Sequence, residues 1–363
     1  MTSSLLLREI RARLAEVPDA DAAEAAARRG AGLLADDVVL ARWREELDAE
    51  LIGAGPLESL LADPQVSDVL VNGPNEVWVD RGHGLRRVDV HFAGEDAVRL
   101  LACRLAMRLG RRLDDAAPWV DAALPDGTRL HAVLPPLVAS TTISLRVLAR
   151  RRLELTALVA CGTVPPAAET ILRAAVTERR TCLVSGSTGC GKTTLLGALI
   201  DLVPADQRVL VIEDAAEIVT RHPHVVRLVA RPPNVEGAGA VGLAELVRQS
   251  LRMRPDRVVV GEFRGAEIAE LLAALNTGHT GGAATVHANT ITDIPARLEA
   301  LCALAGLDAR ATAIQAAAAI DLVVHLERAP GGPRRVACIA RLSRRRESLE
   351  LSELWSCRPG VAP

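Results

Sequence analysis

The chain has 363 residues, of which 49% are apolar and 24% charged, a composition that excludes wholesale disorder and predicts about two globular domains. Its 43 basic and 45 acidic residues leave a formal net charge of −2, so only a local basic patch could bind nucleic acid. Seven scattered cysteines without a C-x-x-C pair argue against a disulfide framework or a zinc site. No stretch approaches about 18 continuous apolar residues, so we expect a soluble, reducing, cytoplasmic protein.

The first half of the chain predicts three segments. Residues 1–52 are rich in Ala, Leu, Arg and Glu at helical spacing, which predicts an N-terminal helical segment. Residues 53–148 alternate short strand-like runs with one helical stretch from Glu95 to about Leu109, which predicts a small α+β domain. Residues 149–166 contain two prolines and a glycine and predict a linker with a helical piece.

The pattern changes in the second half. Over residues 167–345, β-branched runs alternate with helical segments, which is typical of a mostly parallel α/β sheet covered on both faces. Residues 346–363 are left as a C-terminal tail. Ligands of such sheets bind beyond the carboxyl ends of the strands, so functional residues are expected at those ends.

A glycine-rich loop follows the first of these strands and leads into a helix. Its residues are Gly186, Ser187, Thr188, Gly189, Cys190, Gly191, Lys192, Thr193 and Thr194. The run GSTGCGKT matches the phosphate-binding pattern G-x-x-x-x-G-K-[ST] in the required context. In such a loop the backbone amides surround the phosphates, the lysine reaches the β and γ phosphates and the hydroxyl of Thr193 ligates magnesium. Lys192 is the only lysine of the chain, and we expect ATP and Mg²⁺ to bind here.

Acidic and histidine side chains end three further strand-like runs. RVLVIED ends in Glu213 and Asp214, DRVVVGE in Glu262, and GAATVHA in His287. Hydrolysis needs one carboxylate to orient or deprotonate water and another to hold magnesium. The candidate magnesium ligands are the carboxylates of Asp214 and Glu262 together with the Thr193 hydroxyl. A neutral histidine near the γ phosphate could sense its presence. Alternatively, the acids could cap helices or form surface salt bridges, and the histidine could be structural.

Five ordered motifs carry a family resemblance. GSTGCGKTTLL, VIEDAAEI, LRMRPDRVVVGEFRG, NTGHTGGAATVHAN and GRRLDDAAPWVDAALPDGTRLHAVLPP together resemble the ATPases of type II and type IV secretion systems, with the closest likeness to the CpaF-type subgroup that assembles tight-adherence (Flp) pili. The resemblance extends from about Gly53 to about Ala340. It implies a RecA-like P-loop domain that hydrolyses ATP to ADP and phosphate, a homohexameric ring, and polytopic platform proteins at the inner face of the cell membrane as partners.

The resemblance also implies roles for individual residues. Glu213 matches the general base of the family's aspartate box, which Asp214 and Glu217 complete. Glu262 matches the Walker B glutamate, and His287 matches the histidine box.

The resemblance further implies that two arginines of the first domain, Arg129 and Arg146, close over the γ phosphate. Two positions depart from the family pattern. Ala123 stands where an arginine is common, and Phe263 replaces a small aliphatic residue.

Two other functions are compatible with a phosphate loop. RecA-like sheets also drive helicases and recombinases, but 2% aromatic residues and a nearly neutral charge supply few groups for stacking or backbone contacts, so nucleic acid is not an expected partner. A scaffold that binds ATP without turnover is the other alternative, and the presence of both Glu213 and Glu262 argues against it.

Overall fold

The computed structural model describes residues 53–82, 84–124, 126–147, 153–233, 237–328 and 332–357. The chain divides into two compact units, residues 1–58 and 59–363. In the first unit the described residues hold the 3-10 turn η1 (Gly55–Leu57), and the predicted helical segment 1–52 lies outside the described residues. Within the described ranges, no helix combines the length and the apolar character that a membrane span requires.

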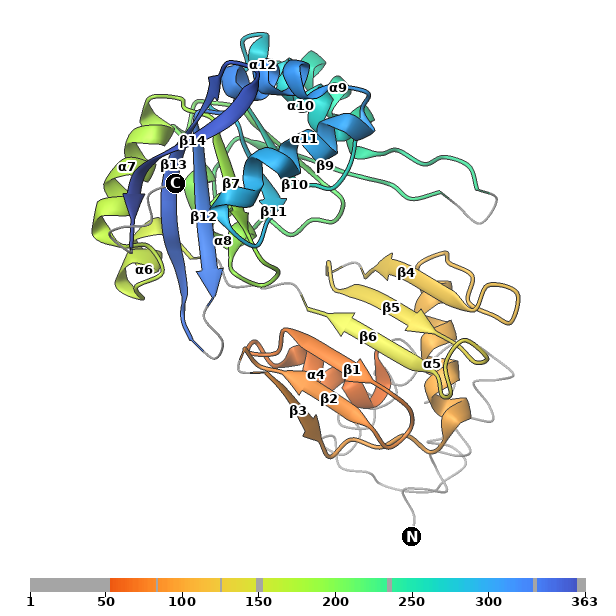
Figure 1. Ribbon diagram of the computed structural model, residues 1–363. Coiled ribbons are helices and arrows are strands. Elements are labelled where there is room, and N and C mark those ends of the chain that lie inside the picture. The colour runs from red at the N-terminus through yellow and green to blue at the C-terminus, as the bar shows by residue number, and fades with distance from the viewer. Residues whose placement is uncertain are drawn as a thin grey trace. The chain divides into compact units, whose positions relative to one another are not determined.

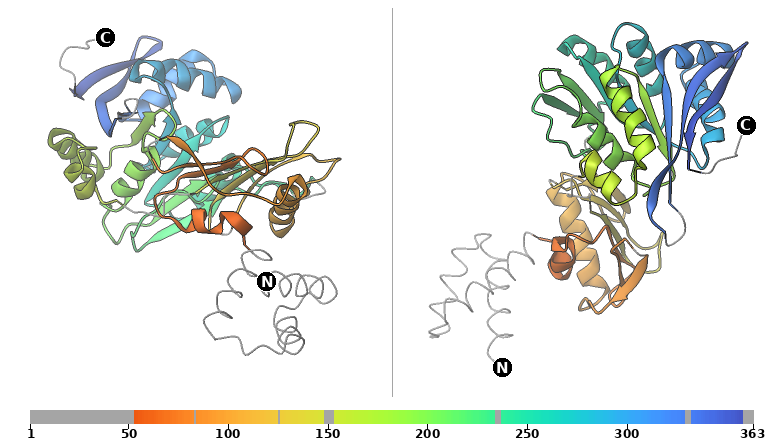
Figure 2. Two further views of the ribbon diagram at one scale, coloured as in Figure 1. Left: turned by 90° about the horizontal axis from the view of Figure 1, so that it is seen from below. Right: turned by 90° about the vertical axis from the view of Figure 1, so that its left-hand side faces the viewer.

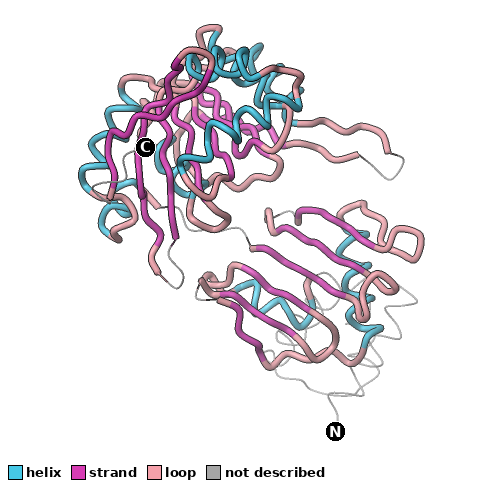
Figure 3. The backbone as a smooth tube through the Cα atoms, viewed as in Figure 1, coloured by secondary structure: helices cyan, strands magenta, loops and turns pink. Residues whose placement is uncertain are grey.

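The second unit begins with a six-stranded antiparallel sheet (Figures 1 and 3). Its strands, in spatial order, are β3 (Leu85–Val88), β2 (Val77–Asp80), β1 (Asp68–Val71), β6 (Thr142–Arg146), β5 (Arg129–Val133) and β4 (Trp119–Ala123). Alternate residues are buried, as Leu130 and Ala132 are on β5, because successive side chains of a strand point to opposite faces. The short α4 (Glu58–Ala62) and the predicted helix, α5 (Glu95–Arg108), complete this part.

An eight-stranded sheet forms the larger part of this unit. Its strands, in spatial order, are β14 (Ser348–Ser356), β13 (Arg334–Arg345), β12 (Leu322–Arg328), β7 (Cys182–Gly186), β11 (Ala283–His287), β10 (Arg257–Phe263), β8 (Val209–Glu213) and β9 (Val225–Val229). The six strands from β12 to β9 are parallel, and β13 and β14 run antiparallel at one edge. The predicted mostly parallel sheet is therefore confirmed.

Helices cover both faces of this sheet, as Figures 1 and 2 show. One hydrophobic cluster joins the sheet to α6 (Leu155–Ala160), α7 (Pro166–Thr177) and α8 (Lys192–Ile200). A second joins it to α9 (Leu243–Ser250), α10 (Glu267–Asn276), α11 (Ile294–Leu304) and α12 (Ala309–Ala319). Burial on two faces explains why the central strands are almost uniformly apolar.

The predicted linker contains the expected helical piece, α6, whose Leu155 and Leu158 are buried in the hydrophobic core. Two strands differ from the expectation. Strand β14 lies within the residues that were left as a tail, where it pairs with β13. Strand β4 was not among the predicted runs, since four of its five side chains are partly or fully exposed and give only a weak strand signal. The predicted domain boundaries otherwise stay a prediction.

The register of the parallel strands positions the phosphate loop. Gly186, the last residue of β7, lies opposite His287 of β11 on one side and Leu326 of β12 on the other. A Cβ at Gly186 would clash with the carbonyl oxygen of Leu326 and with Cys190 Sγ. Only glycine allows the loop to leave the sheet at this point.

A buried polar pair lies directly beneath the loop. His325 of β12, which is 2% exposed, shares a hydrogen bond of 2.9 Å between its Nδ1 and the hydroxyl of Ser185 on β7. Burial lowers the pKa of His325, because removing the ring from water disfavours its charged form.

This burial makes part of the stability depend on pH. The folded pKa of His325 lies below its unfolded value, so its neutral form stabilises the fold above about pH 6.5, and this contribution is lost as the pH falls through the folded pKa. We expect the stability advantage of the wild type over His325→Gln to shrink between pH 7.5 and pH 5.5, measured by urea unfolding. An advantage that is constant or grows over this range would contradict the neutral buried ring.

Candidate active site

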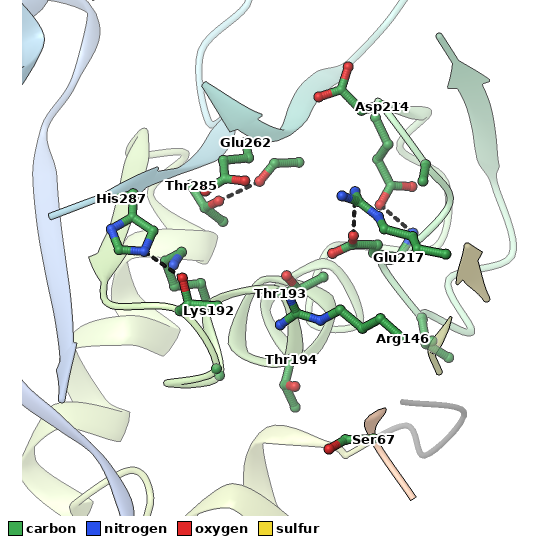
Figure 4. Close-up of a pocket in the computed structure, with 18 of the residues that line it drawn as sticks. Ser67, Arg146, Lys192, Thr193, Thr194, Asp214, Glu217, Glu262, Thr285 and His287 are labelled. Carbon is green, nitrogen blue, oxygen red and sulfur yellow. Dashed lines mark hydrogen bonds and ion pairs between the residues drawn. The ribbon is translucent and has the colours of Figure 1, made fainter. Parts of the chain in front are cut away.

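A cavity of about 830 Å³ opens beside the carboxyl ends of the parallel strands. This volume lies within the range of small-molecule sites. Its lining includes Arg129, Arg146, Thr188, Lys192, Thr193, Thr194, Glu213, Asp214, Glu217, Glu262, His287 and Arg334. The structure therefore brings the predicted phosphate loop, acids, histidine and arginines to one cavity, and Figure 4 shows ten of its residues with labels.

The phosphate loop has the conformation that a nucleotide requires. Gly189 and Gly191 have φ values of +73° and +102°, in the left-handed region that favours glycine. Helix α8 starts at Lys192, so the amides of its first turn, including those of Thr193 and Thr194, lack helical partners. Free amides and the helix dipole make this a site for an anion.

Backbone carbonyl groups of the loop fix the side chain of the single lysine, Lys192. The Lys192 ammonium donates to the carbonyl oxygens of Gly186 at 2.9 Å and Ser187 at 3.0 Å, and the residue is 9% exposed. Within the described ranges no carboxylate pairs with it. Among the described residues, the ammonium group has only neutral carbonyl groups as partners. A phosphate ligand would bind it well, because hydrogen bonds between two charged groups are stronger than hydrogen bonds to a neutral carbonyl.

His287 contacts the loop directly. Its Nε2 shares a hydrogen bond of 2.7 Å with the hydroxyl of Thr188 (Figure 4). Burial and the nearby charge of Lys192 lower the pKa of His287, so the ring is neutral at pH 7 and can both donate and accept hydrogen bonds. The contact joins the end of β11 to the loop, in agreement with the predicted position of this histidine.

Oxygen ligands for magnesium lie on the same edge. Glu262 lies on β10, and Arg264, two residues further, donates to its Oε2 from Nε at 2.8 Å and from Nη2 at 2.6 Å. Asp214 follows β8, and burial raises the pKa of its carboxyl group while Arg264 opposes that rise. Carboxylates together with the Thr193 hydroxyl form the hard-oxygen donor set that Mg²⁺ prefers, so these residues fit the expected metal.

Glu213 is placed differently from what its predicted role requires. The residue is 2% exposed, and its Oε1 accepts backbone N–H bonds from Glu217 at 2.9 Å and Ile218 at 2.7 Å. Its Oε2 forms an ion pair of 2.6 Å with Arg227 of β9. Burial raises its pKa, against the opposing effects of these partners. Both oxygens are occupied, so Glu213 holds the loop after β8 rather than a water molecule.

Glu217 is the more accessible acid of the same box. Its side chain is 31% exposed and lines the cavity. It forms an ion pair of 2.5 Å with Arg129 of β5. The accessibility of Glu217 could not be predicted from the sequence, because the side-chain directions in the turn after β8 cannot be derived from residue spacing.

The two predicted arginines share one face of the antiparallel sheet. Cross-strand pairing places Arg129 opposite Arg146, and Arg146 opposite Asp68. Ala123, where an arginine is common in the family, lies opposite Arg129 in the same row. Adjacent like charges are unfavourable in a sheet, and here Asp68 opposite Arg146 and the ion pair of Arg129 with Glu217 partly offset them. Figure 4 shows Arg146 extending toward Thr193 of the phosphate loop.

Several residues of the cavity were missed by the sequence analysis. Arg264, which directly follows β10, donates two hydrogen bonds to the Oε2 of Glu262 and was not singled out from the sequence. Arg334, at the start of β13, gave no signal of its own, whereas Thr188 had been named as part of the phosphate loop but without a contact to His287.

Comparison with known proteins shows the family. The family model described as "Type II/IV secretion system protein" matches residues 50–340, so the chain belongs to this family. A protein of Mycobacterium tuberculosis (strain ATCC 25618 / H37Rv), provisionally named for conjugal transfer, is 52% identical over 337 residues, which cover 91% of this chain and 96% of that protein. The type IV secretion system protein PtlH of Bordetella pertussis is 31% identical over 272 residues, which cover 68% and 79%.

A solved structure has the same fold. The Legionella pneumophila ATPase DotB superposes with a TM-score of 0.54 and 20% identity, covering 83% of this chain and 81% of that one. The RecA-like α/β fold with a preceding α+β part is thereby confirmed.

The environment of Glu213 predicts a structural effect. We expect Glu213→Gln to lower the free energy of unfolding by about 2 kcal/mol, because Arg227 loses its charge partner but stays partly hydrated. Denaturant unfolding measures this, with Glu350→Gln, at an exposed ion pair, as the control. A loss of unfolding free energy below about 0.5 kcal/mol, the size expected at an exposed ion pair, would contradict the structural role of Glu213 and its ion pair with Arg227.

Proposed function

We propose that this protein is an ATP-hydrolysing motor of a pilus or secretion machinery, of the CpaF type. The observation that supports it best is the juxtaposition at one cavity of the Lys192 ammonium, without a carboxylate partner in the described part of the chain, with Glu217, Glu262 and His287. Membership in the type II/IV secretion family and the motifs quoted above support the same function.

Nucleotide binding is assigned to the loop from Gly186 to Thr194. The amides of the loop and Lys192 bind the phosphates, and Thr193, Asp214 and Glu262 hold Mg²⁺. Bound Mg²⁺ supplies positive charge to the transferring phosphoryl group.

The general base of hydrolysis is Glu217 in this proposal. The oxygen of a water molecule attacks the γ phosphorus, its proton passes to the Glu217 carboxylate, and the bond to the bridging oxygen breaks so that ADP leaves. Glu217 is open to the cavity, whereas Glu213, the base that the resemblance implied, has both oxygens occupied and is 2% exposed. Glu213 instead fixes the loop that carries Glu217.

Arg129 and Arg146 are proposed to stabilise the charge that develops on the γ phosphate. Arg129 is held by Glu217 at 2.5 Å, and Arg146 is exposed on the adjacent strand. A guanidinium in this position accelerates phosphoryl transfer by about 10³- to 10⁵-fold. His287 forms a hydrogen bond with the γ phosphate when it is present, and its contact with Thr188 transmits the resulting shift to the loop. Closure of the α+β domain that carries Arg129 and Arg146 on the nucleotide then couples hydrolysis to movement.

The assembly proposed for this motor is a homohexamer. Its partners are polytopic platform proteins, which hold it at the inner face of the cell membrane. Family membership and the five sequence motifs support this assembly.

Replacing Glu217 tests the catalytic assignment. We expect Glu217→Gln to retain ATP binding and to lose about 10²- to 10⁴-fold in turnover, since the amide cannot accept the proton. Steady-state phosphate release and equilibrium binding of an ATP analogue measure the two effects.

Glu213→Gln is the matched control for this experiment. In the fraction that remains folded, it keeps turnover within a few-fold of the wild type. A loss of turnover in Glu213→Gln with normal turnover in Glu217→Gln would return the role of base to Glu213.

The biological partner can be tested with the same enzyme. We expect a polytopic platform protein in lipid vesicles to stimulate ATP hydrolysis, and single-stranded DNA to leave it unchanged, because the nearly neutral chain offers few groups for a nucleic-acid backbone. Empty vesicles serve as the control. Stimulation by DNA alone would favour a motor that acts on nucleic acid.

A further inference from the structure

The hairpin of β12 and β13 borders the phosphate loop on one flank. Strand β7 has β12 on one side and β11 on the other, so this hairpin lies on the opposite flank from His287 and Glu262. Leu326 of β12 pairs with Gly186 at the start of the loop, and Arg328 of β12 lies opposite Arg334, the first residue of β13.

Arg334 packs against the loop at a glycine. A Cβ at Gly191 would lie 3.6 Å from Arg334 Cδ and 3.8 Å from Leu326 Cδ2, so the aliphatic part of the arginine follows the loop backbone next to Lys192. Arg334 also lines the cavity. Its charge reaches the loop interior, since it opposes the rise that burial causes in the pKa of the Cys190 thiol.

The neighbouring arginines of the hairpin have partners. Arg335 lies 3.8 Å from the carboxylate of Glu327, and Arg328 donates to the carbonyl oxygen of Gly82 at 2.6 Å. For Arg334, which is exposed, no acidic partner occurs in the portions of the hairpin and cavity that the structure describes. It is therefore a guanidinium positioned beside a phosphate loop and without a neutralising charge.

We propose that Arg334 binds the phosphates that ATP and ADP have in common. This inference rests on the proposed function. Within the eight-stranded sheet, the groups assigned to the γ phosphate and Mg²⁺ lie at the ends of β8, β10 and β11, whereas Arg334 approaches Gly191 from the β12 flank. A guanidinium on that flank meets the part of the phosphate chain that remains after hydrolysis, and it binds both nucleotides through charge-assisted hydrogen bonds.

This position gives Arg334 a kinetic signature of its own. An interaction that is equal in the ground state and the transition state changes KM and leaves kcat unaltered. Arg334 also strengthens ADP binding, which a residue specific for the γ phosphate does not do. Because the guanidinium is exposed, its contribution is reduced by salt.

Arg334→Gln is the direct test. We expect the dissociation constants of ADP and of a non-hydrolysable ATP analogue to rise by about tenfold each at low salt, the lower limit for a bond to a charged group. We expect kcat at saturating ATP to stay within twofold of the wild type, and the difference in affinity to diminish between 0.05 M and 0.5 M salt. Arg334→Lys, which keeps the charge, restores part of the affinity.

Arg335→Gln is the matched control, because it removes an adjacent arginine that faces away and pairs with Glu327. It should bind both nucleotides as the wild type does. Unchanged affinity in Arg334→Gln, or a loss confined to the ATP analogue, would overturn the proposal for Arg334. Lys192→Ala separates this from the proposed function: if it binds ATP normally, the nucleotide site itself is wrong, whereas if only Arg334→Gln is silent, the inference about Arg334 alone fails.

Discussion

The register between three parallel strands is the constraint on which the site depends. Because Gly186 lies between His287 and Leu326, the phosphate loop emerges beside a histidine on one flank and a hairpin on the other. The parallel arrangement brings the ends of β8 and β10 to the same edge, and with them Asp214 and Glu262. A sheet with another strand order would separate these groups, although each would keep its local sequence.

Buried polar contacts hold this arrangement in place. Glu213 fixes the turn after β8 through two amides and Arg227, and His325 joins β12 to β7 beneath the loop. Burying such groups is costly unless they are hydrogen-bonded, and both oxygens of Glu213 and the Nδ1 of His325 have partners. Cavity-lining groups, such as the partly exposed Glu217 and the buried Lys192, can therefore be presented from rigid supports.

Much of the fold and part of the site follow from the sequence. The parallel sheet was predictable because strands buried on both faces are apolar throughout, and the phosphate loop because its glycines and Lys192 have a fixed spacing. The difference in burial between Glu213 and Glu217 could not be predicted. It depends on the side-chain directions at the end of β8 and in the following turn, and on Arg227, a residue from another strand. Strand β14 was missed because its exposed, polar face resembles a tail.

Lys192 is the single lysine among 43 Lys and Arg residues, and this composition has a chemical consequence. An acylating or otherwise amine-selective modification finds a single ε-amino group in the whole chain, and that group lies at the nucleotide-binding loop. Acetylation or carbamylation would thus leave the surface charge almost intact while removing the positive charge of Lys192 from the cavity. Any modification of a lysine side chain in this protein therefore falls on the glycine-rich loop that contains Lys192.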